Sequence, residues 1–422
     1  MTATVLPEAT ITGAEAYAAR EKRITDAIAL KQPDRVPTFF IQQLFPARYV
    51  GISLKEAFYD LDKWLAANEK TIIDFDQDTF FLLSAGVATP GQVYEVLGFR
   101  QQKWPGFNLG DDVPFQFVED EYMKADEYDH FLDDPTDFLL RVYLPRTNSA
   151  LAGLSMLPPL KSLVLGVAKL TPLVLAPPVA SALAALQQGA PLAARWAAGE
   201  AAFYRKMAGL GYPAMCGALT MAPFDVITDY LRGLRGIMLD MYRCPDKLQA
   251  AQEKVLPLML GAAIGMAKMS GNNRVILPLH RGADGFMSVK QFEQFYWPYL
   301  KALMLGLLDA GLTPIPFYEG MYDQRLQYLR ELPPGKVLAF FDRTDLFRAK
   351  KIIGDHSCIA GGMLVSLLQS GTVEQVRDLT RRLINEVGAG GGYIMTSSTA
   401  LDDAKPELVK AWLDATLEFG KY

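Results

Sequence analysis

The stretch "RVILPLHRGADGFMSVKQFEQFYWPYLKALMLGLLDAG", residues 274–311, decides the fold. It opens with an apolar strand, Arg274–His280, and a glycine-containing loop leads from it into a long helical pattern that begins at Ser288. The strand is apolar at nearly every position, so we expect both of its faces to be covered. A strand followed by a helix is the repeating unit of a parallel sheet.

Four more units of the same kind follow. Their strands lie in "TPIPFYEG" (313–320), "KVLAFFD" (336–342), "SCIAGGM" (357–363) and "GGYIMTSS" (391–398). Upstream, Val36–Ile41 and Lys70–Leu83 also read as strands. Five units in a row favour an α/β fold of the (β/α)8 barrel type, one domain over residues 1–422, with an irregular, apolar insertion at 91–195. No GxGxxG opens a helix, which weakens a dinucleotide-binding reading.

The overall composition excludes several classes of protein. The 422 residues have a net charge of −5 with both signs mixed, whereas a nucleic-acid binder should show a basic stripe. The three cysteines include no CxxC pair, which argues against a disulfide framework or a structural zinc finger. The first residues lack a signal-peptide pattern, so we expect a cytoplasmic enzyme.

One segment departs from this composition, because no acidic residue occurs between Asp137 and Glu200. Residues 147–194 are almost wholly apolar and contain several prolines, which break a helical register. We expect a lid, or a surface that contacts a membrane or a partner, because an open apolar patch usually has a use.

The candidate site is the rim of the barrel where the strands end, because barrel chemistry lies at the carboxyl ends of the strands. His280, Glu319 and Asp342 each end a strand there, and Ser397 ends the last one. A histidine can ligate a metal or move a proton near neutral pH. Glu319 could be an acid, a base or a ligand, and Asp342 could be a third ligand or could orient His280. Structural alternatives are a hydrogen-bonded histidine, a salt bridge from Glu319 to Arg281 or Arg343, and a capping Ser397.

A second group of acidic residues lies nearer the start of the chain. Asp74, Asp76 and Asp78 alternate in "DFDQD", so on a strand they would share one face. They could hold an amine-like or pyrrole-like group of a substrate, or they could form a solvated strand end.

Several segments resemble the uroporphyrinogen decarboxylase superfamily. They are "ALKQPDRVPTFF", "MAPFDVITDYLRGLRGIMLDMYRCPDKLQAAQEKVL", "FMSVKQFEQFYWPYLKALM" and "CIAGGM…LLQSGTVEQVRD". The resemblance covers about residues 20–90 and 195–422 and implies a (β/α)8 barrel that is usually a homodimer.

The resemblance implies two chemistries. True decarboxylases bind a polycarboxylate through arginines in an "RQAGR" motif, where this chain reads "IQQLFPARY" with Arg48 alone. Corrinoid-linked methyltransferases use zinc held by His-x-Cys and a later Cys, where this chain has Phe317–Glu319 and Ser397. Zinc on His280 and Glu319, perhaps with Asp342, would suit a demethylase branch, with a corrinoid on a partner protein as methyl acceptor.

Two alternatives stay open. One is decarboxylation of the kind used in porphyrin biosynthesis, with Asp74 or Asp76 on a substrate nitrogen and Arg281 and Arg343 on carboxylates. The other is a barrel without catalysis that binds a lipid-like ligand or a membrane surface.

Overall fold

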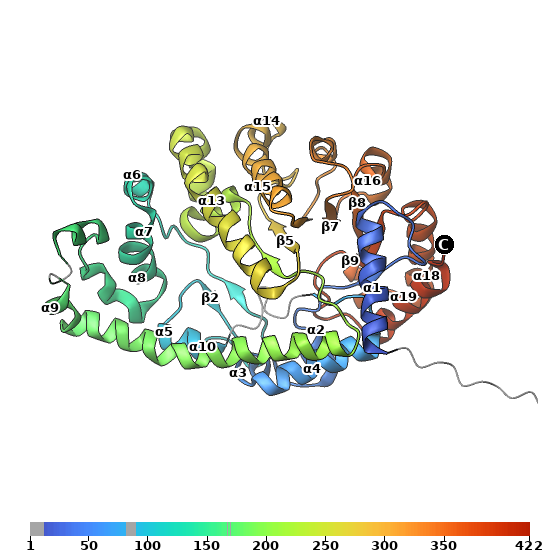
Figure 1. The fold of residues 1–422 in the computed structure, drawn as a ribbon, viewed down its shortest axis with the longest axis horizontal. Coiled ribbons are helices and arrows are strands. Elements are labelled where there is room, and N and C mark those ends of the chain that lie inside the picture. The colour runs from blue at the N-terminus through green and yellow to red at the C-terminus, as the bar shows by residue number, and fades with distance from the viewer. Residues whose placement is uncertain (1–11, 82–89, 167, 169) are drawn as a thin grey trace, which may run out of the picture.

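The computed structural model describes residues 12–81, 90–166, 168 and 170–422, and it is a barrel of parallel strands surrounded by helices (Figure 1). Seven strands pair in the order β1-β9-β8-β7-β6-β5-β4. Their bounds are β1 Thr38–Phe39, β4 Ala218–Leu219, β5 Arg274–Leu279, β6 Thr313–Tyr318, β7 Leu338–Phe341, β8 Cys358–Met363 and β9 Tyr393–Ser397. The strands predicted from residue 274 onward are therefore confirmed.

The gap between β1 and β4 is bridged by a short extended segment around Phe80. Asp78 N donates to Thr38 O at 3.0 Å on the β1 side. On the other side, Phe80 forms a parallel bridge with Ala214, and Met215 N donates to Phe80 O at 2.7 Å. This segment takes the eighth strand position, which closes the (β/α)8 barrel.

The predicted strand Lys70–Leu83 is wrong over its first part. Residues Leu61–Phe75 form helix α4, whose apolar positions repeat every three or four residues and are buried. Its C-cap residue Asp76 is in the left-handed conformation, and the extended segment begins only after it. Residues 82 and 83 lie outside the described part of the chain.

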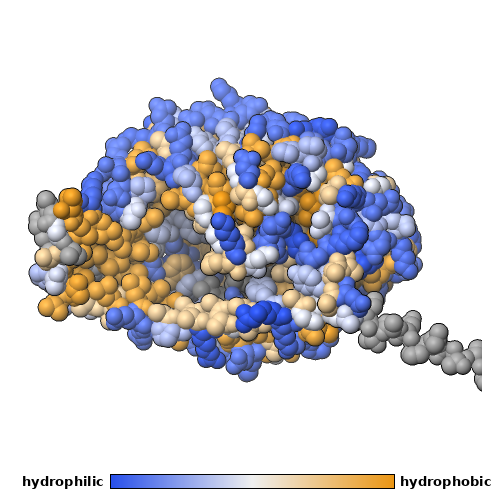
Figure 2. All heavy atoms as spheres, viewed as in Figure 1, coloured by the Kyte–Doolittle hydropathy of each residue, from blue (hydrophilic) through white to orange (hydrophobic). Residues whose placement is uncertain are grey.

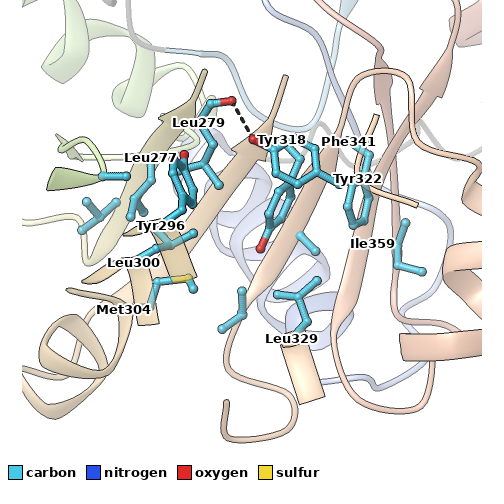
Figure 3. Packing of buried hydrophobic residues seen from close by; sticks show 14 of the residues in the cluster. Leu277, Leu279, Tyr296, Leu300, Met304, Tyr318, Tyr322, Leu329, Phe341 and Ile359 are labelled. Atoms are coloured by element: carbon cyan, nitrogen blue, oxygen red, sulfur yellow. Dashed lines mark hydrogen bonds between the residues drawn. The ribbon is translucent and has the colours of Figure 1, made fainter. Parts of the chain in front are cut away.

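Apolar side chains form two layers, one inside the barrel and one between the barrel and its helices. Ile276, Phe317 and Phe340 belong to the inner layer. Figure 3 shows the outer layer, where Tyr296 and Tyr322 pack beside Leu277 and Leu279, and Tyr322 Oη donates to Leu279 O at 3.2 Å. The alternation of a strand assigns each residue to one layer, and so predicts which strand-end residues face the barrel axis.

The helices follow the strands as the unit pattern requires. Around the barrel they are α1 Gly13–Ile28, α2 Phe45–Val50, α3 Leu54–Tyr59, α4, α11 Pro223–Val226, α12 Gly233–Arg243, α13 Pro245–Ser270, α14 Val289–Gln291, α15 Trp297–Asp309, α16 Leu346–Ile353, α17 Val365–Ser370, α18 Val373–Glu386 and α19 Pro406–Phe419. The unit after β6 has only a 3-10 turn, η8 Leu326–Glu331. Asp345 caps α16 by accepting from Phe347 N and Arg348 N.

The insertion is mostly helical, so its predicted irregularity is wrong. It contains α5 Gly91–Leu97, the hairpin β2 Gln102–Lys103 with β3 Gln116–Phe117, α6 Tyr128–Asp133, α7 Pro135–Phe138, α8 Leu144–Thr147, η3 Ser149–Met156, η4 Leu160–Leu165 and α9 Thr171–Val174. Helix α10, Pro177–Gly209, then runs back toward α1 and holds Pro191 inside it (Figure 1). Among the described residues, no helix is long and apolar enough to cross a membrane.

Candidate active site

His280 follows β5 directly, and its side chain is fixed by an acidic residue from the neighbouring unit. Its Nδ1 donates to Asp229 Oδ2 at 2.5 Å, and Asp229 lies in the π-helical turn η6, Ile227–Arg232. Asp229 Oδ1 also accepts from Arg281 Nε at 3.1 Å and from Arg281 Nη2 at 2.9 Å. One carboxylate thus orients both residues that follow the strand.

A second carboxylate, Asp225 of α11, lies beneath this pair and is fully buried. Its oxygens accept from His280 N at 3.1 Å, from Arg281 N at 3.0 Å and from Tyr296 Oη at 2.6 Å. Burial raises the pKa of Asp225 to about 6, the charge of His280 lowers it, and the nearby Asp229 raises it further. This residue fixes the backbone of the strand end rather than facing open space.

Glu319 and Asp342 continue the rim on the next two strands. Ile276, Phe317 and Phe340 point into the barrel, so side chains further along at the same alternation point the same way at the carboxyl end. Glu319 Oε1 lies 3.5 Å from His280 Nε2. Asp342 Oδ2 accepts from Gly320 N at 3.1 Å, and burial raises its pKa. The structure therefore brings the three predicted rim residues together.

The two carboxylates keep His280 charged. Burial lowers the pKa of the imidazole, but the hydrogen bonds from Asp229 and Glu319 outweigh it, and the charge of Asp225 adds to their effect. The result is a pKa of about 11. An imidazolium donates from both ring nitrogens, and 3.5 Å is too long for a hydrogen bond between Nε2 and Glu319. The Nε2 proton is therefore available to a bound molecule.

His280 and Glu319 form part of the wall of a cavity of about 1120 Å³. Much of the remaining wall is apolar or aromatic, with Phe81, Phe115, Phe117, Met221, Tyr230, Met266 and Phe317 among its residues. Helix α10 closes one side with Ala197, Ala201 and Tyr204, and Figure 2 shows the surface hollowed beside this helix. Such a volume suits a mostly apolar small molecule with a few polar groups to orient it.

The predicted alternation of Asp74, Asp76 and Asp78 on one strand face is wrong. Asp74 lies in α4 and accepts from Tyr49 Oη at 2.7 Å, while Asp76 accepts from Tyr212 Oη at 2.8 Å. Asp78 is fully buried and pairs with arginines instead. Three separate environments hold these carboxylates, because α4 ends between Asp74 and Asp78. The substrate-binding role predicted for Asp74 and Asp76 has no support from these positions.

The other predicted substrate-binding residues differ in their surroundings. Arg281 is engaged by Asp229, and its guanidinium lies 3.7 Å from Glu119. Arg343 is 77% exposed, with its Nε 3.8 Å from Asp342. Ser397 is fully buried, and its Oγ accepts from Ile41 N at 3.4 Å. Ser397 therefore supports the barrel wall, while Thr399 and Ala400 after it line the cavity.

A zinc site needs more donors than the rim provides. Catalytic zinc takes three protein ligands and one open position. His280 and Glu319 give two converging donors, with Asp229 placed to orient the imidazole as an outer partner would. Among the described residues, no three His, Cys, Asp or Glu side chains are grouped closely enough to hold one ion. The donor set therefore does not fit zinc, and zinc binding stays a prediction.

Sequence reasoning missed Asp225 and Asp229, which fix the position of His280. Their spacing of four residues in "PFDVITD" would place both on one helical face, which was a usable signal. The pairing itself joins residues 51 positions apart, and only the closed barrel brings η6 to the end of β5.

Comparisons with known proteins give a family and a fold. The profile of the family described as uroporphyrinogen decarboxylase (URO-D) matches residues 168–419. A solved methyltransferase from Methanosarcina mazei is similar over 95% of this chain and 98% of its own, with 15% identity and a TM-score of 0.62. A B12-independent methionine synthase from Shewanella sp. W3-18-1 covers 52% of this chain and 63% of its own, at 13% identity and a TM-score of 0.34. No curated protein sequence matches the chain.

These findings agree with the residues that build the site. The matched region contains α11, η6 and every strand from β4 to β9, so it includes Asp225, Asp229, His280, Glu319 and Asp342. The structural similarity extends over nearly the whole chain and shows the same fold. The chain belongs to the uroporphyrinogen decarboxylase family.

Proposed function

We propose that this protein is a methyltransferase that removes a methyl group from an oxygen, nitrogen or sulfur atom of a hydrophobic substrate in the cavity. The observation that carries the proposal is the charged His280, whose free Nε2 proton faces an apolar cavity. The full-length similarity to a methyltransferase of the same fold supports this choice. The methyl acceptor we propose is the reduced corrinoid of a partner protein.

The chain's own residues would serve the leaving atom. When the bond from the methyl carbon to the heteroatom breaks, its electron pair stays on the heteroatom. His280 Nε2 lies at the cavity wall and donates its proton to that atom, while the methyl group passes to the nucleophilic acceptor. Asp229 holds the ring in place, and Glu319 stabilises the imidazolium beforehand. The proton is then replaced from solvent.

The cavity favours a hydrophobic substrate over a porphyrinogen with many carboxylates. A polyanion needs several cationic donors. Among the described residues of the cavity wall, the cationic side chains are Arg205 and His280, while Glu200 and Glu319 carry the opposite charge. Arg281, the cation next along the chain, is already paired with Asp229. This charge balance argues against porphyrinogen decarboxylation.

The test is methyl transfer from a panel of hydrophobic methyl ethers, methylamines and thioethers to a free reduced corrinoid. Product would be followed by absorbance and by mass spectrometry. We expect turnover by the wild type and a loss of about 10²–10⁴-fold in His280→Gln, which is the usual contribution of a positioned acid. His356→Gln is the matched control, since His356 contacts Leu332 O at 2.8 Å rather than the site. Equal rates in both variants, carbon dioxide release from a carboxylated substrate, or no turnover would contradict the proposal.

A further inference from the structure

The end of the insertion presents a cluster of exposed apolar side chains. We call this the apolar tip and define it by Met156, Val164, Val174, Leu175 and Leu186. Val164 is 88% exposed and Leu175 is 82% exposed. Figure 2 shows apolar surface gathered at the end of the molecule where Figure 1 places α9 and the start of α10. A continuous exposed apolar patch at one end of a protein usually marks a contact surface.

The apolar tip is carried on a packed framework. Leu151, Leu154 and Ala182 form a small buried cluster beneath it. η3 also lies tightly on α10, because a side chain at Gly153 would meet the backbone of Pro178. The exposed residues above this cluster are therefore held outward by buried contacts of their own. They cannot turn inward without breaking that packing.

The charges around the apolar tip favour one kind of partner. Residues 138–199 contain three arginines and two lysines but no aspartate or glutamate. A protruding apolar element with basic and no acidic residues matches a lipid surface that carries anionic headgroups. Lys161 of η4 is 60% exposed and lies 2.5 Å from Asp133, so its ammonium is at the edge of this surface.

We propose that the apolar tip seats the protein on an anionic lipid surface by inserting its exposed side chains among the lipids. Helix α10 begins at the apolar tip and further along forms one side of the cavity through Ala197, Ala201 and Tyr204. The cavity would then lie beside the lipid surface, where hydrophobic molecules dissolve. This last point rests on the proposed function, whereas the contact with lipid does not.

The experiment is co-sedimentation of the full chain with vesicles of phosphatidylcholine, with and without phosphatidylglycerol. The test variant is Val164→Asp/Leu175→Asp. The matched control is Val373→Asp/Leu417→Asp, which alters a valine at 47% and a leucine at 39% exposure on α18 and α19. We expect the wild type and the control to bind vesicles containing phosphatidylglycerol, and the test variant to bind about tenfold more weakly.

The other outcomes would overturn the proposal. They are wild type that stays in the supernatant with every vesicle, equal loss in both double variants, or equal binding to vesicles with and without phosphatidylglycerol. A dimer that Val164→Asp/Leu175→Asp converts to a monomer, without vesicle binding by the wild type, would mean that a second copy covers the apolar tip. No substrate is present in this assay, so its failure is distinct from a failure of methyl transfer.

Discussion

Asp225 gives a prediction about stability that follows directly from its burial. The carboxyl group is fully buried, and burial raises its pKa to about 6 despite hydrogen bonds from His280 N and Tyr296 Oη. The change to test is Asp225→Asn, which keeps the size of the side chain and one accepting oxygen but removes the titration. We expect this variant to lose one component of the pH dependence of unfolding.

The sign and the size of that component follow from linkage. The folded state binds the Asp225 proton more tightly than the unfolded state, in which the pKa is about 3.9. The resulting stabilisation is complete below pH 3.9 and is lost as the pH rises to about 6. A shift of about two units corresponds to about 3 kcal/mol. Of this, about 2 kcal/mol falls between pH 4.5 and 7.5.

The measurement is urea unfolding of both proteins at several pH values. The free energy of unfolding of the wild type minus that of Asp225→Asn should fall by about 2 kcal/mol from pH 4.5 to 7.5. Asp378→Asn removes the same charge from a side chain that is 64% exposed, and it controls for net charge. A difference that stays flat, or that rises with pH, would refute the view that burial dominates at Asp225.

Two further predictions concern the barrel closure and the metal. Asp78→Ala should cost about 3–5 kcal/mol of unfolding free energy, because it leaves Arg23 and Arg35 without their buried partner. Asp74→Ala, which breaks a pair with the exposed Lys70, should cost under about 1 kcal/mol, and equal costs by urea unfolding would contradict the role of Asp78. Inductively coupled plasma mass spectrometry should find substoichiometric zinc, since the rim has two converging donors, and a zinc ion lost in His280→Gln would contradict this.

The second half of the fold could be predicted from the sequence because its strands are buried on both faces. β5, β6, β7, β8 and β9 are apolar along their length, and that pattern differs from the helices between them. The segment Thr71–Phe75 misled the prediction because it is apolar and β-branched, yet its residues continue the buried face that begins at Leu61 and Trp64 of α4. Here the helical spacing of the longer segment outweighed local strand preference.

The site could be predicted only in part, for a similar reason. The barrel rule places His280, Glu319 and Asp342 at strand ends, and strand alternation then points them inward. The partners Asp225 and Asp229 come from a helix whose position depends on the whole barrel. The aromatic wall from Phe115 and Phe117 comes from the insertion, whose packing on the barrel has no local sequence signal.

The central claim is that His280 is charged at neutral pH and holds a proton ready at the cavity wall. The chain has three histidines, so nitrogen NMR of protein labelled at histidine can follow each ring, with His280→Gln to assign the signal. We predict that His280 stays doubly protonated from pH 6 to 9 and that Asp229→Asn lowers its pKa by about 1–3 units. A wild-type His280 that titrates near the ordinary value of about 6.5, unchanged in Asp229→Asn, would contradict the account.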